Sequence, residues 1–366
     1  MSKAAELANL IGNINAGGGG VNRNLIINGA MNVSQRGTSF TTVTDSTYTL
    51  DRFNYRKSND GEVTITQDSS GPDGFANSLK VDVTTADTSI AAGQFAIIEY
   101  NIEAQDLQKL AFGTSSAKNF TLSFYVKSNK TGTYAVNISQ NDNSSKQATL
   151  NYTINSANTW ERKSLTFTGD TSGVINDDNG IGFLLYWWLA VGTTFTSGST
   201  SATFQAYDNA DAAAGHAVNL LDDTANEWFI TGVQLEIGQN ATEFEHEPFE
   251  RTLAKCQRYF YTEVDPDGSM FSLVGFTDSS GNAYIQHIHS PEMRADPTLS
   301  TTGVVTDYAL RVGGNTITCN TVPTLSSTST KFAHVLWRVA SGLTTGHAIT
   351  GKHTGANDFL HWDAEL

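Results

Sequence analysis

The segment FTLSFYVKS, from Phe120 to Ser128, alternates apolar and polar residues. The same alternation recurs in YAVNISQ (Tyr134–Gln140), ATLNYTI (Ala148–Ile154) and RKSLTFTG (Arg162–Gly169). A period of two places every second side chain on one face of a sheet, so each segment is expected to be a strand with one buried face. Clusters of turn-forming residues such as SNKTG and NDNSS separate the segments, which indicates antiparallel neighbours.

This pattern extends in both directions, through EVTITQ (Glu62–Gln67) and SLKVDVTT (Ser78–Thr85) toward the N-terminus. One short helical patch, AQDLQKLAF, interrupts the strands, and no segment is long enough for a helical crossover. We therefore expect an all-β fold in which residues 24–245 form a jelly-roll β-sandwich.

A connecting helix is expected in EPFERTLAKCQRYF, where Phe249, Leu253, Cys256 and Phe260 fall at helical spacing. We assign residues 246–262 to this helix. Residues 263–366 return to strands and turns, with a hairpin around Ser279 to Asn282 and a strand in KFAHVLWRVA. They are expected to form a second, smaller β domain.

The first 23 residues begin with a helical stripe formed by Ala4, Leu7, Ile11 and Ile14, and Gly17 to Gly20 follow it. Two heptads are too few for a stable isolated helix, so another surface must bury the stripe. We interpret residues 1–23 as an anchoring or oligomerising helix with a glycine hinge. A frayed leader without a role is the alternative.

Charge and hydropathy exclude several partners. Lys and Arg number 22 against 37 Asp and Glu, which gives a formal charge of −15 without a basic run. Nucleic acid and anionic membranes are therefore not expected as partners. The most apolar segment, from Ile181 to Val191, is too short to span a bilayer, and the opening residues lack the apolar stretch of a signal peptide. We expect a soluble protein made in a cytoplasm.

Tyr186, Trp187 and Trp188 are the candidate ligand-binding residues, because flat rings offer a platform for the apolar face of a sugar. Adjacent residues of a strand point to opposite faces, so only one of the two tryptophans is expected to face outward. The alternative is that all three belong to the core or to a subunit interface. Trp160 and Trp228 are expected in the core.

His287 and His289 form a His-x-His pair on one strand face. Around a three-fold axis, three such pairs would supply six imidazoles to an octahedral metal. One pair alone supplies two ligands, so histidines without a metal are the favoured interpretation. We expect no cofactor and find no catalytic motif, so we predict that the chain is not an enzyme.

Two stretches resemble tail-fibre and virion-fibre proteins of tailed phages, including those of cyanophages. They are NLIINGAMNVSQRGTSF (Asn24–Phe40), followed by LDRF (Leu50–Phe53), and WFITGVQLEIGQNATEFEHEPFERTLAKCQRYF (Trp228–Phe260). MSKAAELANLIG and MRADPTLS (Met293–Ser300) resemble the leader and the C-terminal domain of such fibres. The central strands also look like a carbohydrate-binding jelly-roll module.

The resemblance implies a structural protein of the virion, usually a homotrimer, that joins other virion proteins through its N-terminus and contacts host-surface polysaccharide. It implies a location on the tail or the particle surface. A capsid-attached or neck-attached fibre with a purely structural role is one alternative, and a glycan-degrading tailspike is another. No fixed-period repeat of β-helix rungs appears in the sequence, which disfavours the tailspike.

Overall fold

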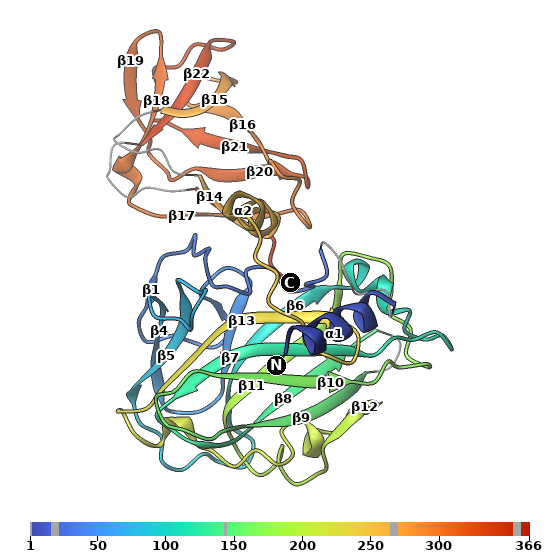
Figure 1. Ribbon diagram of the computed structural model, residues 1–366. Coiled ribbons are helices and arrows are strands. Elements are labelled where there is room, and N and C mark those ends of the chain that lie inside the picture. Colours follow the sequence, from blue (N-terminus) through green and yellow to red (C-terminus); the bar gives the residue numbers. More distant parts are fainter. Residues whose placement is uncertain (1, 16–21, 143–144, 264–269, 354–359) are drawn as a thin grey trace. The chain divides into compact units, whose positions relative to one another are not determined.

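The computed structural model describes residues 2–15, 22–142, 145–263, 270–353 and 360–366. The chain forms two compact units, Met1–Thr252 with Leu366, and Leu253–Glu365. In both units the regular structure is mainly antiparallel strands (Figure 1), which confirms the predicted all-β fold class. The division between the units falls between Thr252 and Leu253, within the segment 246–262 that is predicted to be a connecting helix.

Two sheets build the first unit. Sheet 1 has the order β1-β4-β5-β13-β7-β10 and consists of β1 (Ser39–Phe40), β4 (Glu62–Asp68), β5 (Ser78–Thr85), β13 (Glu227–Ile237), β7 (Phe120–Ser128) and β10 (Glu161–Phe167). Sheet 2 has the order β12-β9-β8-β11-β6-β3-β2 and consists of β12 (Ser201–Ala206), β9 (Lys146–Ile154), β8 (Gly132–Gln140), β11 (Ile181–Val191), β6 (Phe95–Glu103), β3 (Phe53–Lys57) and β2 (Thr47–Tyr48).

The alternation of the sequence decides which side chains enter the core of the sandwich. In β7, Phe120, Leu122 and Phe124 are fully buried in one hydrophobic cluster that also contains residues of sheet 2. Tyr125 and Lys127 alternate with these residues and lie on the opposite face of the strand, where they are partly exposed. Sheet 1 therefore has one face in the core and one face toward solvent.

Helices are few in the first unit. α1 (Lys3–Asn15) confirms the predicted N-terminal helix, and Gly17 to Gly20 lie outside the described residues. Three short 3-10 helices follow, η1 (Ala104–Leu110), η2 (Asn209–Asp211) and η3 (Leu220–Asp222). Among the described residues, no helix is long and apolar enough to cross a bilayer.

The second unit begins within α2 (Phe249–Gln257), the predicted connecting helix. This helix is shorter than expected, because Phe260 belongs to strand β14 (Phe260–Glu263). Sheet 3 has the order β14-β23-β17, with β23 (Leu360–Asp363) and β17 (Thr298–Thr301).

Sheet 4 has the order β19-β18-β22-β15-β16-β21-β20. Its strands are β19 (Asn315–Thr318), β18 (Tyr308–Val312), β22 (Ala348–His353), β15 (Met270–Thr277), β16 (Asn282–Ile288), β21 (Phe332–Arg338) and β20 (Thr324–Thr328), and η4 (Val305–Asp307) precedes β18. β15 and β16 form the predicted hairpin. A separate hydrophobic cluster that contains Trp337 and Trp362 is the core of this unit.

Candidate functional site

The predicted sugar platform does not lie on an open surface. Trp187 of β11 is fully buried between the sheets, where its ring lies 6.0 Å from that of Phe124. Trp188 points to the other face of sheet 2 but is only 4% exposed, because the rings of Phe95 and Phe195 pack against it. Tyr186 shares that face, is largely buried, and has a raised pKa for this reason. Trp187 and Trp188 do point to opposite faces of the sheet, as expected, but neither ring is exposed, which agrees with the alternative that these side chains are buried.

Residues on both sides of β12, which is itself the edge strand of sheet 2, cover this part of the sheet: Phe195 before the strand and residues 212–216 after it. Ala212 and Ala213 pack with Trp188 in one hydrophobic cluster. The backbone N–H of Ala135 in β8 donates to Nδ1 of His216 at 3.2 Å, and Nε2 of the same ring lies 2.6 Å from the carbonyl oxygen of Val218. The covering segment is therefore tied to the sheet through a buried histidine, whose burial lowers its pKa from 6.5 to about 4.

His216 predicts an acid-sensitive first unit. Its pKa is lower in the folded state than in the unfolded state, so the unfolded state binds the proton first and stability falls as the pH drops from about 6.5 to about 4. Between pH 7 and pH 4.5 we expect this residue alone to remove about 2 to 3 kcal/mol of unfolding free energy. Urea denaturation at both pH values measures the loss. In His216→Gln, which cannot titrate, the loss must be smaller by that amount, and equal losses in both proteins would contradict the assignment.

The two histidines considered as candidate metal ligands are buried inside the second unit. His287 is fully buried and its Nδ1 lies 2.7 Å from a carboxylate oxygen of Glu263. Nδ1 of His289 lies 2.8 Å from the hydroxyl of Tyr261, and both imidazoles contact the ring of Trp362. Burial, followed by the neighbouring His287, lowers the pKa of His289 to about 4.

These contacts correct the idea that the pair faces a symmetry axis, since side chains enclosed by their own unit cannot reach ligands of another copy. Within the described part of the chain, no group of three or more His, Cys, Asp or Glu side chains is placed to hold a metal ion.

The predicted oligomerisation stripe lies on α1. Leu7 and Ile11 are 57% and 49% exposed, and Ala4 is exposed as well. The side chain of Ile14 lies outside the described residues. The assembly role of this stripe stays a prediction.

The stretches that resemble phage fibres meet in the first unit and form an N-terminal clasp, which we define as residues 22–35 packed against β13 and residues 242–245. The N–H of Leu25 donates to the carbonyl of Leu235, and that of Val233 donates to the carbonyl of Gly29. A Cβ at Gly29 would lie 2.0 Å from the carbonyl oxygen of Val233, so only glycine fits there.

Glu245 binds the first residues of this clasp. Its carboxylate accepts hydrogen bonds from the backbone N–H groups of Asn22, Arg23 and Asn24 at 2.7, 2.8 and 2.9 Å. Its own N–H donates to the side-chain oxygen of Gln234 at 2.8 Å. The side chains of Glu245 and Gln234 thus stabilise the packing of residues 22–24 against β13.

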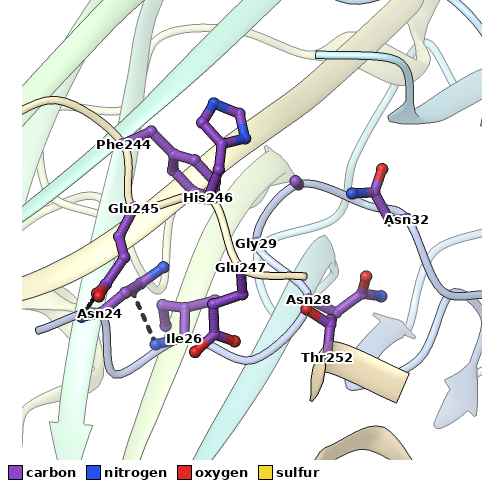
Figure 2. Close-up of a pocket in the computed structure, with 11 residues that line it drawn as sticks. Asn24, Ile26, Asn28, Gly29, Asn32, Phe244, Glu245, His246, Glu247 and Thr252 are labelled. Atoms are coloured by element: carbon purple, nitrogen blue, oxygen red, sulfur yellow. Dashed lines mark hydrogen bonds between the residues drawn. The ribbon is translucent and has the colours of Figure 1, made fainter. Parts of the chain in front are cut away.

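A hollow lies beside the clasp (Figure 2), with a volume of about 380 Å³ that includes its part open to solvent. Its lining residues are Asn24, Ile26, Asn28, Gly29, Ala30, Asn32, Phe244, Glu245, His246, Glu247 and Thr252. The rings of Phe244 and His246 form one wall and pack against each other at 4.9 Å. The hollow is shallow and acidic, so by itself it is a poor site for an anionic ligand.

The outer face of sheet 1 carries rings and basic groups in register. Phe229 of β13 pairs with Lys80 of β5 on one side and with Lys127 of β7 on the other. The ammonium of Lys127 lies 3.9 Å from the centroid of the Phe229 ring and 5.1 Å from that of Trp160, the residue before β10. Both distances are within the range of cation–π attraction. Trp160 is partly exposed on this face, which corrects its expected place in the core, whereas Trp228 is fully buried as expected.

The next set of paired residues along these strands adds another aromatic ring and another basic side chain. Tyr125 pairs with Thr231 on one side and with Arg162 on the other, and the Arg162 guanidinium lies 6.0 Å from the Tyr125 ring. We call Tyr125, Lys127, Trp160, Arg162 and Phe229 the aromatic–basic patch. All except Phe229 are partly exposed.

A glycine shapes the surface beside this patch. Gly232 has φ of 61°, and a Cβ there would lie 2.8 Å from the Phe75 ring and 2.9 Å from the Tyr125 ring. Because Gly232 has no Cβ, the Phe75 ring can lie over β13. Its centroid is 5.3 Å from that of Tyr125 and 5.0 Å from that of Phe244. Aromatic surface therefore continues from Tyr125 to the wall of the hollow.

The side chains of the aromatic–basic patch are of kinds that are suited to contact a saccharide. Tyr and Trp rings offer flat apolar area at low entropic cost, and they match the C–H faces of sugar rings. Lys127 and Arg162 add N–H donors for hydroxyl and carboxylate oxygens. The sequence signal that would have found the site is the phase of the alternation in β7, since Phe124 and Val126 face the core and Tyr125 and Lys127 must face outward.

Comparisons with known proteins complete the description. No family model matches the sequence, and no curated protein is significantly similar to it. Among solved structures, the chain is similar to the enzymatically active domain of tailspike protein 4 of bacteriophage CBA120, with 12% identity, a TM-score of 0.33, and coverage of 59% of this chain and 21% of that one. It is also similar to a family 4 carbohydrate-binding module, with 14% identity and a TM-score of 0.30. The match covers 57% of this chain and 97% of the module. A family 11 carbohydrate-binding module of a cellulosomal cellulase from Clostridium thermocellum is 12% identical, with a TM-score of 0.29. The match covers 57% of this chain and 98% of that module.

Proposed function

We propose that this chain is a non-enzymatic fibre protein of a phage virion that binds host-surface polysaccharide through the aromatic–basic patch. The single observation that carries the binding role is the open face of sheet 1, where Trp160 and Tyr125 lie beside Lys127 and Arg162. Side chains of this kind, gathered on one exposed surface, favour a ligand with both apolar faces and polar edges.

The fibre role rests on the sequence resemblance of the N-terminal clasp and of residues 228–260. It is supported by the exposed Leu7 and Ile11 of α1, which are apolar side chains in need of a partner surface. We propose that α1 anchors the chain to other virion proteins or to further copies of itself in a homotrimer on the particle surface. Analytical ultracentrifugation of the full chain and of Leu7→Asp tests the self-association.

Adhesion and polysaccharide cleavage predict different outcomes with the same reagents. Purified protein is incubated with immobilised envelope polysaccharide of the host, and both retention and new reducing ends are measured. We expect retention without new reducing ends, because a binding surface holds the chain and leaves its glycosidic bonds intact. Retention with a steady rise in reducing ends would establish a tailspike enzyme instead. If the protein is not retained and no reducing ends appear, a fibre with a purely structural role is the alternative that remains.

A further inference from the structure

We propose that the aromatic–basic patch binds an acidic saccharide, in which a uronic acid presents its carboxylate to Lys127 while its ring lies against Trp160. This inference rests on the proposed glycan-binding function and names the class of glycan. The observations that carry it are the charged groups around Phe229.

Two ammonium groups lie near the same ring but differ in their surroundings. Lys80 lies 5.6 Å from the Phe229 centroid and forms ion pairs with Glu227 at 2.5 Å and with Asp82 at 3.7 Å. Lys127 lies closer to the ring, yet among the residues that the structure describes it has no carboxylate within ion-pair distance. Its positive charge is therefore not neutralised by a neighbouring carboxylate, although the chain as a whole has a formal charge of −15.

Two rings contact the ammonium of Lys127. The group lies 3.9 Å from the centroid of Phe229 and 5.1 Å from that of Trp160, and these centroids are 6.1 Å apart with ring planes at 70°. A lysine held in this way has lost part of its side-chain freedom before a ligand arrives, which lowers the entropic cost of binding. An incoming carboxylate then gains a charge-assisted hydrogen bond.

The rest of the patch supports the same orientation. Arg162 lies two residues beyond Trp160 on the same face, and its pairing with Glu243 at 3.7 Å is loose. Glu161 pairs with Lys163 at 2.5 Å, so the nearest acidic residue in the sequence is already engaged. A sugar on Trp160 therefore meets the positive charge of Lys127 along its edge, whereas Arg162 also donates to the carbonyl oxygen of Thr242 and faces the exposed Glu243.

The test compares matched ligands and matched variants. Isothermal titration is carried out with an oligogalacturonide and with its carboxyl-reduced, neutral counterpart, and the same is done with a glucuronate-containing oligosaccharide and its reduced form. Lys127→Met removes the charge and keeps an unbranched apolar stem over the rings. Lys127→Arg keeps the charge. Lys118→Met serves as the control, because this partly exposed lysine precedes β7 at the end opposite Lys127.

We expect the native chain to bind at least one acidic ligand about tenfold more tightly than its neutral counterpart, in line with the strength of a charged hydrogen bond. Lys127→Met should abolish that preference and retain the neutral affinity, whereas Lys127→Arg and Lys118→Met should keep the preference. Equal affinity of the native chain for every acidic and neutral pair, or a preference that survives in Lys127→Met, would overturn the inference and leave glycan binding itself intact. Failure to bind any glycan, acidic or neutral, would overturn both proposals.

Discussion

Replacing Trp187 by alanine is expected to lower the unfolding free energy of the first unit by about 3 to 5 kcal/mol, because a fully buried indole leaves both its transfer energy and a cavity behind. Trp187 contacts Phe124 across the sandwich and belongs to the same cluster as Trp228. Urea denaturation followed by tryptophan fluorescence measures the change as a shift of the midpoint at constant slope.

Two controls separate packing from binding. Trp187→Phe keeps most of the apolar volume and should cost less than half of the alanine loss. Trp160→Ala, on the outer face of sheet 1, should change stability by less than about 1 kcal/mol, since surface substitutions rarely do more. A stable Trp187→Ala protein that had lost glycan binding would show that the indole is a ligand platform after all.

Trp160→Ala is expected to weaken binding to the host polysaccharide at least about tenfold, the loss typical of truncating an aromatic anchor at a binding surface. Trp160→Phe keeps a ring and should lose less. Tyr186→Phe, which removes only a hydroxyl on sheet 2, is the matched control and should bind like the native chain. Surface plasmon resonance on immobilised polysaccharide gives the three affinities, and an unchanged Trp160→Ala together with a weakened Tyr186→Phe would move the site to sheet 2.

The strands of both units could be predicted because the sequence repeats a period of two, and the same period decides the core face of each strand. Phe120, Leu122 and Phe124 are fully buried, as their alternation indicates. The helical spacing of residues 3–15 and 249–257 was equally readable, and both segments are helices. These features depend only on neighbours in the sequence.

The candidate site depended on segments far apart in the chain. Trp188 does point away from the core, but Phe195 and residues 212–213 pack over it. No local pattern shows that a later loop will pack on a given strand, so the sequence alone could not decide between an exposed and a covered ring.

Trp160 and His287 show that the phase of the alternation in a strand is more informative than residue type. Trp160 is expected in the core because it is large and apolar, although it lies two residues before Arg162 and shares its outward face. His287 is only a disfavoured candidate for a metal ligand, and the structure buries it in the same phase as Ala283 and Ile285 of β16.

The most direct test of the account observes all six tryptophans of the chain at once. Their indole N–H groups give separate signals in a two-dimensional nitrogen–proton spectrum, assigned through single Trp→Phe variants, and the host polysaccharide or a fragment of it is titrated in. We predict that the Trp160 signal shifts and saturates, while the signals of the buried Trp187 and Trp188 stay in place. Shifts of Trp187 or Trp188 with an unchanged Trp160 would contradict a glycan site on the outer face of sheet 1.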